Sequence, residues 1–110
     1  MQKITKTYYG EAERLKTQIL QAAGETANLV DGSETVRGDT MIGLYIYEKF
    51  FMRNNSVASL SLQLIQEQES VELTAVSSGS GYGYFKLDWG AADKLIEVLE
   101  ENLCRIIKKN

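Results

Sequence analysis

Apolar residues recur with a helical period in two stretches of the chain. Over about 11–23 they return every three or four residues, which places them on one face of a short helix that Gly24 is expected to end. A longer stripe over 90–108 predicts a C-terminal helix with Asp88 as its N-cap. Each helix therefore has one apolar face to bury. The stripe of the longer helix contains Ala92, Leu95, Ile96, Leu99, Leu103, Ile106 and Ile107.

Between and before these helices, apolar and polar residues alternate with a period of two, which predicts strands. The predicted strands are 3–9, 27–37, 40–53, 57–66, 71–75 and 84–87. Asp31-Gly32 is a candidate bulge or turn in the second strand, and Gly38-Asp39 is expected to turn the chain into the third. The glycine-rich segment 77–83 is expected to connect the last two strands.

The segment 40–66 is the clearest hairpin. Asn54-Asn55 is its expected two-residue turn, since asparagine tolerates a positive φ. We expect the side of the first strand that carries Ile42, Leu44 and Ile46 to face the core. The leucines of the second strand, Leu60, Leu62 and Leu64, are expected to face the same layer.

The order of elements predicts one α+β domain over residues 1–110. A sheet with one solvent-exposed face and one apolar face needs both helices on the apolar face. We therefore predict an antiparallel sheet of about five or six strands, with one short helix and a long C-terminal helix on one face, which is a helix-grip-like arrangement. A two-layer ferredoxin-like fold is the alternative, but it requires a helix between later strands, where no helical period occurs.

Composition limits the classes of partner and the cellular compartment that we expect. The net charge is −3 without a basic block, so we expect no nucleic acid partner. No apolar run approaches the roughly 20 residues of a membrane span, and the first ten residues lack the apolar centre of a signal peptide. We therefore predict a cytoplasmic protein. Cys104, the one cysteine, is expected to be a small buried apolar residue of the last helix.

The absence of histidine limits the chemistry that is available. It excludes histidine acid–base catalysis, histidine triads and histidine metal sites. Asp88 and Asp93 are explained as a helix cap and a first-turn acid, and no third ligand is spaced near them. We therefore predict no metal, no cofactor and no catalytic residue, and we favour a protein that is not an enzyme.

Candidate binding residues come from two features of the second half of the chain. Tyr45, Tyr47 and Arg53 share one side of a strand, where arginine could hold an anionic group between flat aromatic walls. Gly79, Gly81 and Gly83 could form a lid, with Trp89 at one end of a groove. The simpler interpretations are a solvated sheet face, a hairpin connection and a helix anchor.

Two separated segments carry a family resemblance. Residues 47–61, YEKFFMRNNSVASLS, and residues 79–93, with GSGYG followed by FKLDWGAAD, resemble the signatures of an uncharacterised family of small bacterial proteins. The resemblance spans essentially the whole chain and implies no known activity. The topology is also similar to the helix-grip folds of lipid- and hormone-binding proteins, although a fold does not by itself imply a function.

Two functional hypotheses follow. The first is a non-enzymatic small binding module, with a cavity or groove between the sheet and the C-terminal helix for a small apolar or anionic ligand. The alternative is a homodimer or other homo-oligomer that pairs through the aromatic sheet face or an edge strand. A space beneath the helix that is not filled by side chains would favour the first hypothesis.

Overall fold

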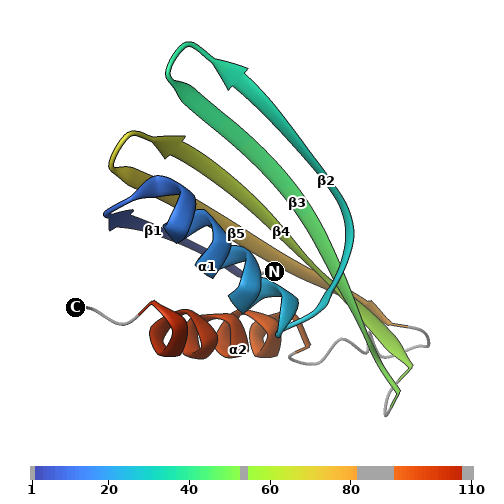
Figure 1. The fold of residues 1–110 in the computed structure, drawn as a ribbon. Helices are drawn as coiled ribbons and strands as arrows, with labels where there is room; N and C mark the ends of the chain where they lie inside the picture. Colours follow the sequence, from blue (N-terminus) through green and yellow to red (C-terminus); the bar gives the residue numbers. More distant parts are fainter. Residues whose placement is uncertain (1, 53–54, 82–90, 108–110) are drawn as a thin grey trace.

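Five antiparallel strands form one sheet, and two helices cover one of its faces (Figure 1). The computed structural model describes residues 2–52, 55–81 and 91–107. The strands lie in the order β1-β5-β4-β3-β2, so β1 and β2 are the two edges. The elements are β1 Gln2–Tyr9, α1 Ala12–Gly24, β2 Asn28–Arg37, β3 Thr40–Phe51, β4 Ser56–Glu67, β5 Ser70–Gly81 and α2 Ala91–Ile106.

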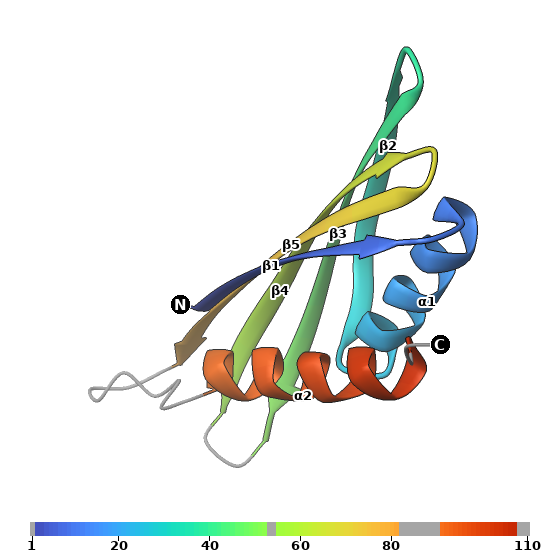
Figure 2. The same ribbon diagram turned by 90° about the vertical axis from the view of Figure 1, so that its left-hand side faces the viewer.

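The core lies between the helices and the inner face of β4 and β5. Alternate residues of β4 are buried, because every second side chain points toward the helices. The predicted stripe of α2 meets them, with Leu95, Leu99 and Leu103 almost fully buried. Ile19 and Ala22 of α1 complete this layer. This is the predicted helix-grip-like α+β arrangement, with α2 running across the strands rather than along them (Figure 2).

Polar contacts fix the two helices to each other. The side chain of Asn102 on α2 donates to Thr26 Oγ1, just after α1, at 3.1 Å. Gln18 of α1 donates to the carbonyl of Ile106 at 3.3 Å. Arg105 pairs with Glu25, and this hydrogen bond lowers the pKa of the Glu25 carboxyl. These contacts hold the ends of both helices over the same face of the sheet.

The predicted inner face of β3 is wrong. Tyr45 and Tyr47 are 7% and 3% exposed and point toward the helices, whereas Leu44 is 52% exposed on the opposite face. The pairing of Phe51 with Ser56 leaves four residues in the connection, not the expected two. Any loop of even length sets odd-numbered residues of β3 opposite even-numbered residues of β4. The leucines of β4 therefore share a face with the tyrosines and not with Ile42, Leu44 and Ile46.

The other differences from the predicted elements concern where helices and strands begin and end. Strand β5 is much longer than predicted, because it continues in register with β4 as far as Gly81. Helix α1 includes Gly24 and ends at Glu25 in a right-handed conformation, so the left-handed glycine stop is not used. The irregularity predicted near Asp31 is confirmed as a register shift between Leu29 and Asp31. The expected strand 84–87 and the expected N-cap Asp88 lie outside the described residues.

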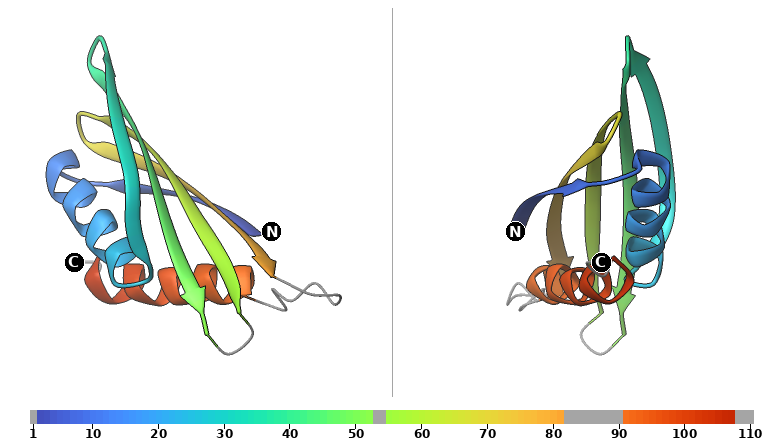
Figure 3. Two further views of the ribbon diagram at one scale, coloured as in Figure 1. Left: turned by 90° about the vertical axis from the view of Figure 1, so that its right-hand side faces the viewer. Right: turned by 60° about the vertical axis from the view of Figure 1, so that its left-hand side comes forward.

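The sheet is larger than the layer that covers it. The molecule measures 48 × 29 × 18 Å, and the β2–β3 hairpin extends well beyond both helices (Figure 3). The helix-free face carries exposed apolar side chains, including Leu44 and Phe50. No helix of the described chain has the length and apolar character to cross a membrane.

Candidate functional site

A groove lies between the edge strand β1 and the flank of α2 that the core does not use. Its volume is about 830 Å³ and it is open to solvent. Residues spaced three or four apart share one side of a helix, so Glu97, Glu100, Glu101 and Cys104 lie together beside the buried stripe. The sheet ends at β1, so this flank faces the edge of the sheet rather than its centre.

The floor of this β1–α2 groove is apolar. Tyr8 contributes its ring from β1, and Ile107 contributes aliphatic surface from the residue after α2. Leu103 of α2, which is almost fully buried, borders the groove from the core. Cys104 also lines the groove, and its thiol side chain is exposed, which corrects the expectation that it is buried. Its apolar neighbours favour a buried position, but Cys104 lies one position beyond the buried stripe.

The rim of the β1–α2 groove is charged, with more acids than bases. Lys6 Nζ lies 3.6 Å from Glu100 Oε2 across the groove. Arg105, which also lines the groove, is paired with Glu25. Burial, followed by the nearby Cys104 and Glu100, raises the pKa of the Tyr8 hydroxyl to about 12. Tyr8 is therefore protonated at neutral pH and can donate a hydrogen bond.

A second hollow continues the groove past Tyr8 and Ile107. It holds about 630 Å³ between the end of β1, the start of α1 and the end of α2. Gly10, Arg14 and Gln18 line it. Because both hollows share Tyr8 and Ile107, an elongated molecule could lie along the whole edge of the sheet.

The structure places Tyr45 in a network with β2 and α1 rather than on a free surface. Its hydroxyl donates to Glu34 Oε2 of β2, and the same oxygen lies 2.8 Å from Lys16 Nζ of α1. Lys16 and then Tyr45 lower the pKa of Glu34, while burial and then Glu34 raise the pKa of Tyr45. Burial also raises the pKa of Tyr47. Both tyrosines are therefore protonated structural groups of the inner layer.

Two glycines make room for the ring of Tyr45. A methyl group at Gly43 would lie 2.6 Å from the Tyr45 hydroxyl oxygen, and one at Gly32 would lie 2.9 Å from its ring. The aromatic ring therefore covers two backbone positions that have no side chain. This packing accounts for a large flat side chain at position 45 of the inner face of β3.

The remaining predicted site residues are not brought together with Tyr45 by the described structure. Gly79 and Gly81 are strand residues of β5, opposite Ala58 and Ser56, so they do not form a glycine loop there. Strand β4 lies between them and β3. Arg53, Gly83 and Trp89 lie outside the described residues.

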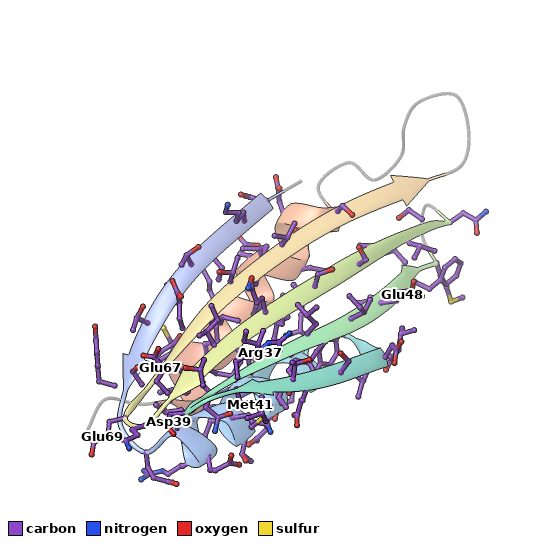
Figure 4. The ribbon with its side chains drawn as sticks, turned by 90° about the horizontal axis from the view of Figure 1, so that it is seen from above. Arg37, Asp39, Met41, Glu48, Glu67 and Glu69 are labelled. Atoms are coloured by element: carbon purple, nitrogen blue, oxygen red, sulfur yellow. The ribbon has the colours of Figure 1, made fainter. Side chains whose placement is uncertain are left out.

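Acidic side chains gather at the end of the sheet where two hairpins meet. Figure 4 shows Asp39, Glu67 and Glu69 there, with Glu48 toward the opposite end of β3. In residues 2–52, 55–81 and 91–107, however, no three or more Asp, Glu, Cys or His are arranged to hold a metal ion. This acidic end therefore offers no described metal centre.

The groove residues are not among the predicted site residues. Alternation in 3–9 places Lys6 and Tyr8 on one side, and the helical period places Glu97, Glu100 and Cys104 on one flank. These two signals are visible in the sequence. What the sequence does not show is that β1 is an edge strand and that this flank lies beside it.

Comparison with solved structures finds distant likenesses. The crystal structure of the di-domain ARO/CYC StfQ from the steffimycin biosynthetic pathway matches with 10% identity and a TM-score of 0.35, over 94% of this chain and 43% of the other. This chain thus spans less than half of that protein. The crystal structure of TTHA0849 from Thermus thermophilus matches with 12% identity and a TM-score of 0.33, over 96% and 94%. Likenesses this weak give no information on function.

Comparison by sequence identifies the family of the chain. No curated protein matches the chain. The model of a family of unknown function, DUF6054, matches residues 1–107. This match covers both segments that carry the resemblance noted in the sequence, and it confirms that resemblance. The chain therefore belongs to DUF6054, a family of unknown function.

Proposed function

We propose that this protein is a non-enzymatic binding module whose β1–α2 groove holds a small, largely apolar molecule. The observation that carries the proposal is an apolar floor left open by Tyr8 and Ile107, where the buried core residue Leu103 borders the groove. An apolar hollow with a few polar groups at its rim is the usual form of a small-molecule site.

The interior beneath α2 does not compete as a site in the described chain. Leu60, Leu73 and Leu99 are fully buried there and belong to one hydrophobic core. A ligand that entered this space would have to displace well-packed side chains, which costs stability. The groove at the edge of the sheet requires no such displacement.

The charge of the rim narrows the class of ligand. Glu97, Glu100 and Glu101 surround the floor, whereas the two bases, Lys6 and Arg105, are already paired with Glu100 and Glu25. Carboxylates disfavour an anionic group nearby and favour a cation or a hydrogen-bond donor. We therefore infer an apolar molecule whose polar end is uncharged or cationic, in place of the anionic ligand that Arg53 had suggested.

The test uses Nile red, an uncharged apolar dye, and the exposed position 104. Wild-type protein should bind the dye with increased fluorescence, and Cys104→Tyr should weaken binding by about tenfold or more because the new ring fills the groove. Lys94→Tyr is the matched control, since Lys94 lies on α2 outside the groove. The proposal fails if wild-type protein does not bind the dye, or if both variants bind it equally well.

A further inference from the structure

We propose that the protein forms a homodimer in which the β1 strands of two copies pair antiparallel, with Lys6 on the two-fold axis. The proposal goes beyond ligand binding and does not depend on it. It rests on the direction of the β1 backbone groups, on the difference between the two sheet edges and on the self-complementary sequence of β1.

The backbone groups of β1 that face away from the sheet can be identified. Gly10 N–H donates to the carbonyl of Glu69 at 3.0 Å, one step beyond the pairing of Tyr9 with Ser70. Hydrogen-bonded and non-hydrogen-bonded pairs alternate along an antiparallel ladder. Even-numbered residues of β1 therefore bond to β5, and the N–H and C=O groups of Lys3, Thr5 and Thr7 point outward. No strand of the described chain lies beyond them.

The opposite edge of the sheet is interrupted near its start, whereas β1 is regular throughout. Strand β2 has a register shift between Leu29 and Asp31, and the Asp31 side chain accepts a hydrogen bond from Gly32 N–H at 2.8 Å. Bulges and local capping of this kind disfavour the addition of another strand at that point. Strand β1 pairs with β5 over all eight residues without a shift. It is therefore the edge that can accept a strand.

The sequence of β1 favours one register of self-pairing. With Lys6 on the axis, Ile4 lies opposite Tyr8 of the second copy, and this pair occurs twice on the helix-covered side. These are non-hydrogen-bonded pairs, in which side chains approach most closely. With Thr5 on the axis, Ile4 would instead lie opposite Lys6. Since Ile4 and Tyr8 already pack against the core, the first register extends the apolar layer across the dimer.

Carboxylates near Lys6 offset the charge repulsion that this register creates. It brings two Lys6 ammonium groups together at the axis, which would be unfavourable if each stood alone. Each Lys6, however, lies beside Glu100, and Glu97 and Glu101 line the same groove. The three carboxylates of a groove can interact with the lysines of both copies. A two-fold axis perpendicular to the sheet keeps all helices on one face, so the two grooves meet beneath a ten-stranded sheet.

Disulfide trapping tests the register directly. In a Cys104→Ser background, Lys6→Cys places two cysteines opposite each other at about 4.5 Å between Cα atoms, which suits a disulfide. We expect rapid oxidation to a covalent dimer. Thr5→Cys is the matched control, because its copies would lie about 7–8 Å apart on the diagonal, too far for a disulfide. Cross-linking of Thr5→Cys but not Lys6→Cys would overturn the proposed register.

Light scattering tests whether the edge pairs at all. Wild-type protein should show twice the mass of one chain. Thr5→Pro removes an outward N–H without breaking a bond to β5, so it should give a folded monomer by circular dichroism. Thr5→Ala keeps the N–H and should remain a dimer. A monomeric wild type, or a Thr5→Pro variant that stays dimeric, would refute the pairing. Nile red binding per chain is measured separately, so failure of the dimer and failure of the ligand site are distinguishable.

Discussion

Replacement of Gly43 by alanine tests whether the ring of Tyr45 lies on the backbone of β3 as described. Glycine to alanine in ordinary strand geometry stabilises a protein by about 0.4–1 kcal/mol, because the unfolded chain loses freedom. At Gly43 the new methyl group would lie 2.6 Å from the Tyr45 hydroxyl oxygen and 2.7 Å from a ring carbon. The ring cannot move easily, since it is buried and its hydroxyl is held by Glu34.

Overpacking of a filled site costs about 1–3 kcal/mol, so the steric term should exceed the entropic gain. We expect Gly43→Ala to lower the free energy of unfolding by about 1–2 kcal/mol. Urea unfolding followed by circular dichroism measures this change. Gly24→Ala is the matched control, because no atom lies within 4 Å of the new methyl group. It should stabilise the protein by about 0.5–1 kcal/mol.

A double-mutant cycle identifies the cause. In a Tyr45→Ala background the contact is absent, so Gly43→Ala should lose most of its cost, with a coupling of about 1 kcal/mol. If Gly43→Ala is as stable as wild type, or if it costs the same with and without the Tyr45 ring, the described packing of Tyr45 is refuted.

Burial, ion pairing and groove charge give four further predictions. Leu99→Ala should lower the free energy of unfolding by about 2–5 kcal/mol because Leu99 is fully buried. Leu44→Ala on the helix-free face should change it by less than about 0.5 kcal/mol. Equal losses in urea unfolding would contradict the assignment of these residues to a buried and an exposed face. The lowered pKa of Glu34 means that its ion pair stabilises the fold above the ordinary carboxyl pKa and is lost as the pH falls through the lowered value. Lys16→Met should therefore make the free energy of unfolding less dependent on pH below neutrality. An unchanged dependence at acidic pH would show that the Lys16–Glu34 pair contributes nothing to stability. The pKa of Tyr8 is raised from 10.0 to about 12, so the free energy of unfolding should fall as the pH rises through this range. The Tyr8→Phe variant should lose less stability over the same range, and an identical loss in both proteins would contradict the raised pKa. Dodecylamine should displace Nile red from the groove at lower concentration than dodecanoate, and the reverse order would exclude an acidic rim as the source of selectivity.

Much of the fold could be predicted from periodicity, because the helices and the leucines of β4 each obey one local rule. The face of β3 was assigned wrongly because isoleucine and leucine alternate with tyrosine, and hydropathy alone favours the aliphatic side. The even length of the hairpin loop would have corrected it. Strand β5 was cut short because its glycines and serines have low strand propensity, which pairing with β4 overrides.

The candidate site was less predictable than the fold. Aromatic and glycine residues drew attention to the second half of the chain, but Tyr45 is used for packing against Gly32 and Gly43. The groove combines residues that are far apart in the sequence, such as Tyr8 and Cys104, which are 96 positions apart, and each is unremarkable in its own segment. Their proximity follows from β1 pairing with β5, which periodicity does not reveal.

The pairing of the first strand with the last also has a consequence for biosynthesis. Strands β2 to β5 join neighbours along the chain and can assemble as they leave the ribosome. Strand β1, although made first, must wait for partners between 61 residues later (Tyr9 to Ser70) and 75 residues later (Gln2 to Ser77). The edge that we propose for dimer formation therefore exists only once β5 has been synthesised and β1 has docked. Association of two copies would then be confined to chains that have completed their sheet, which keeps partly made chains from pairing through this surface.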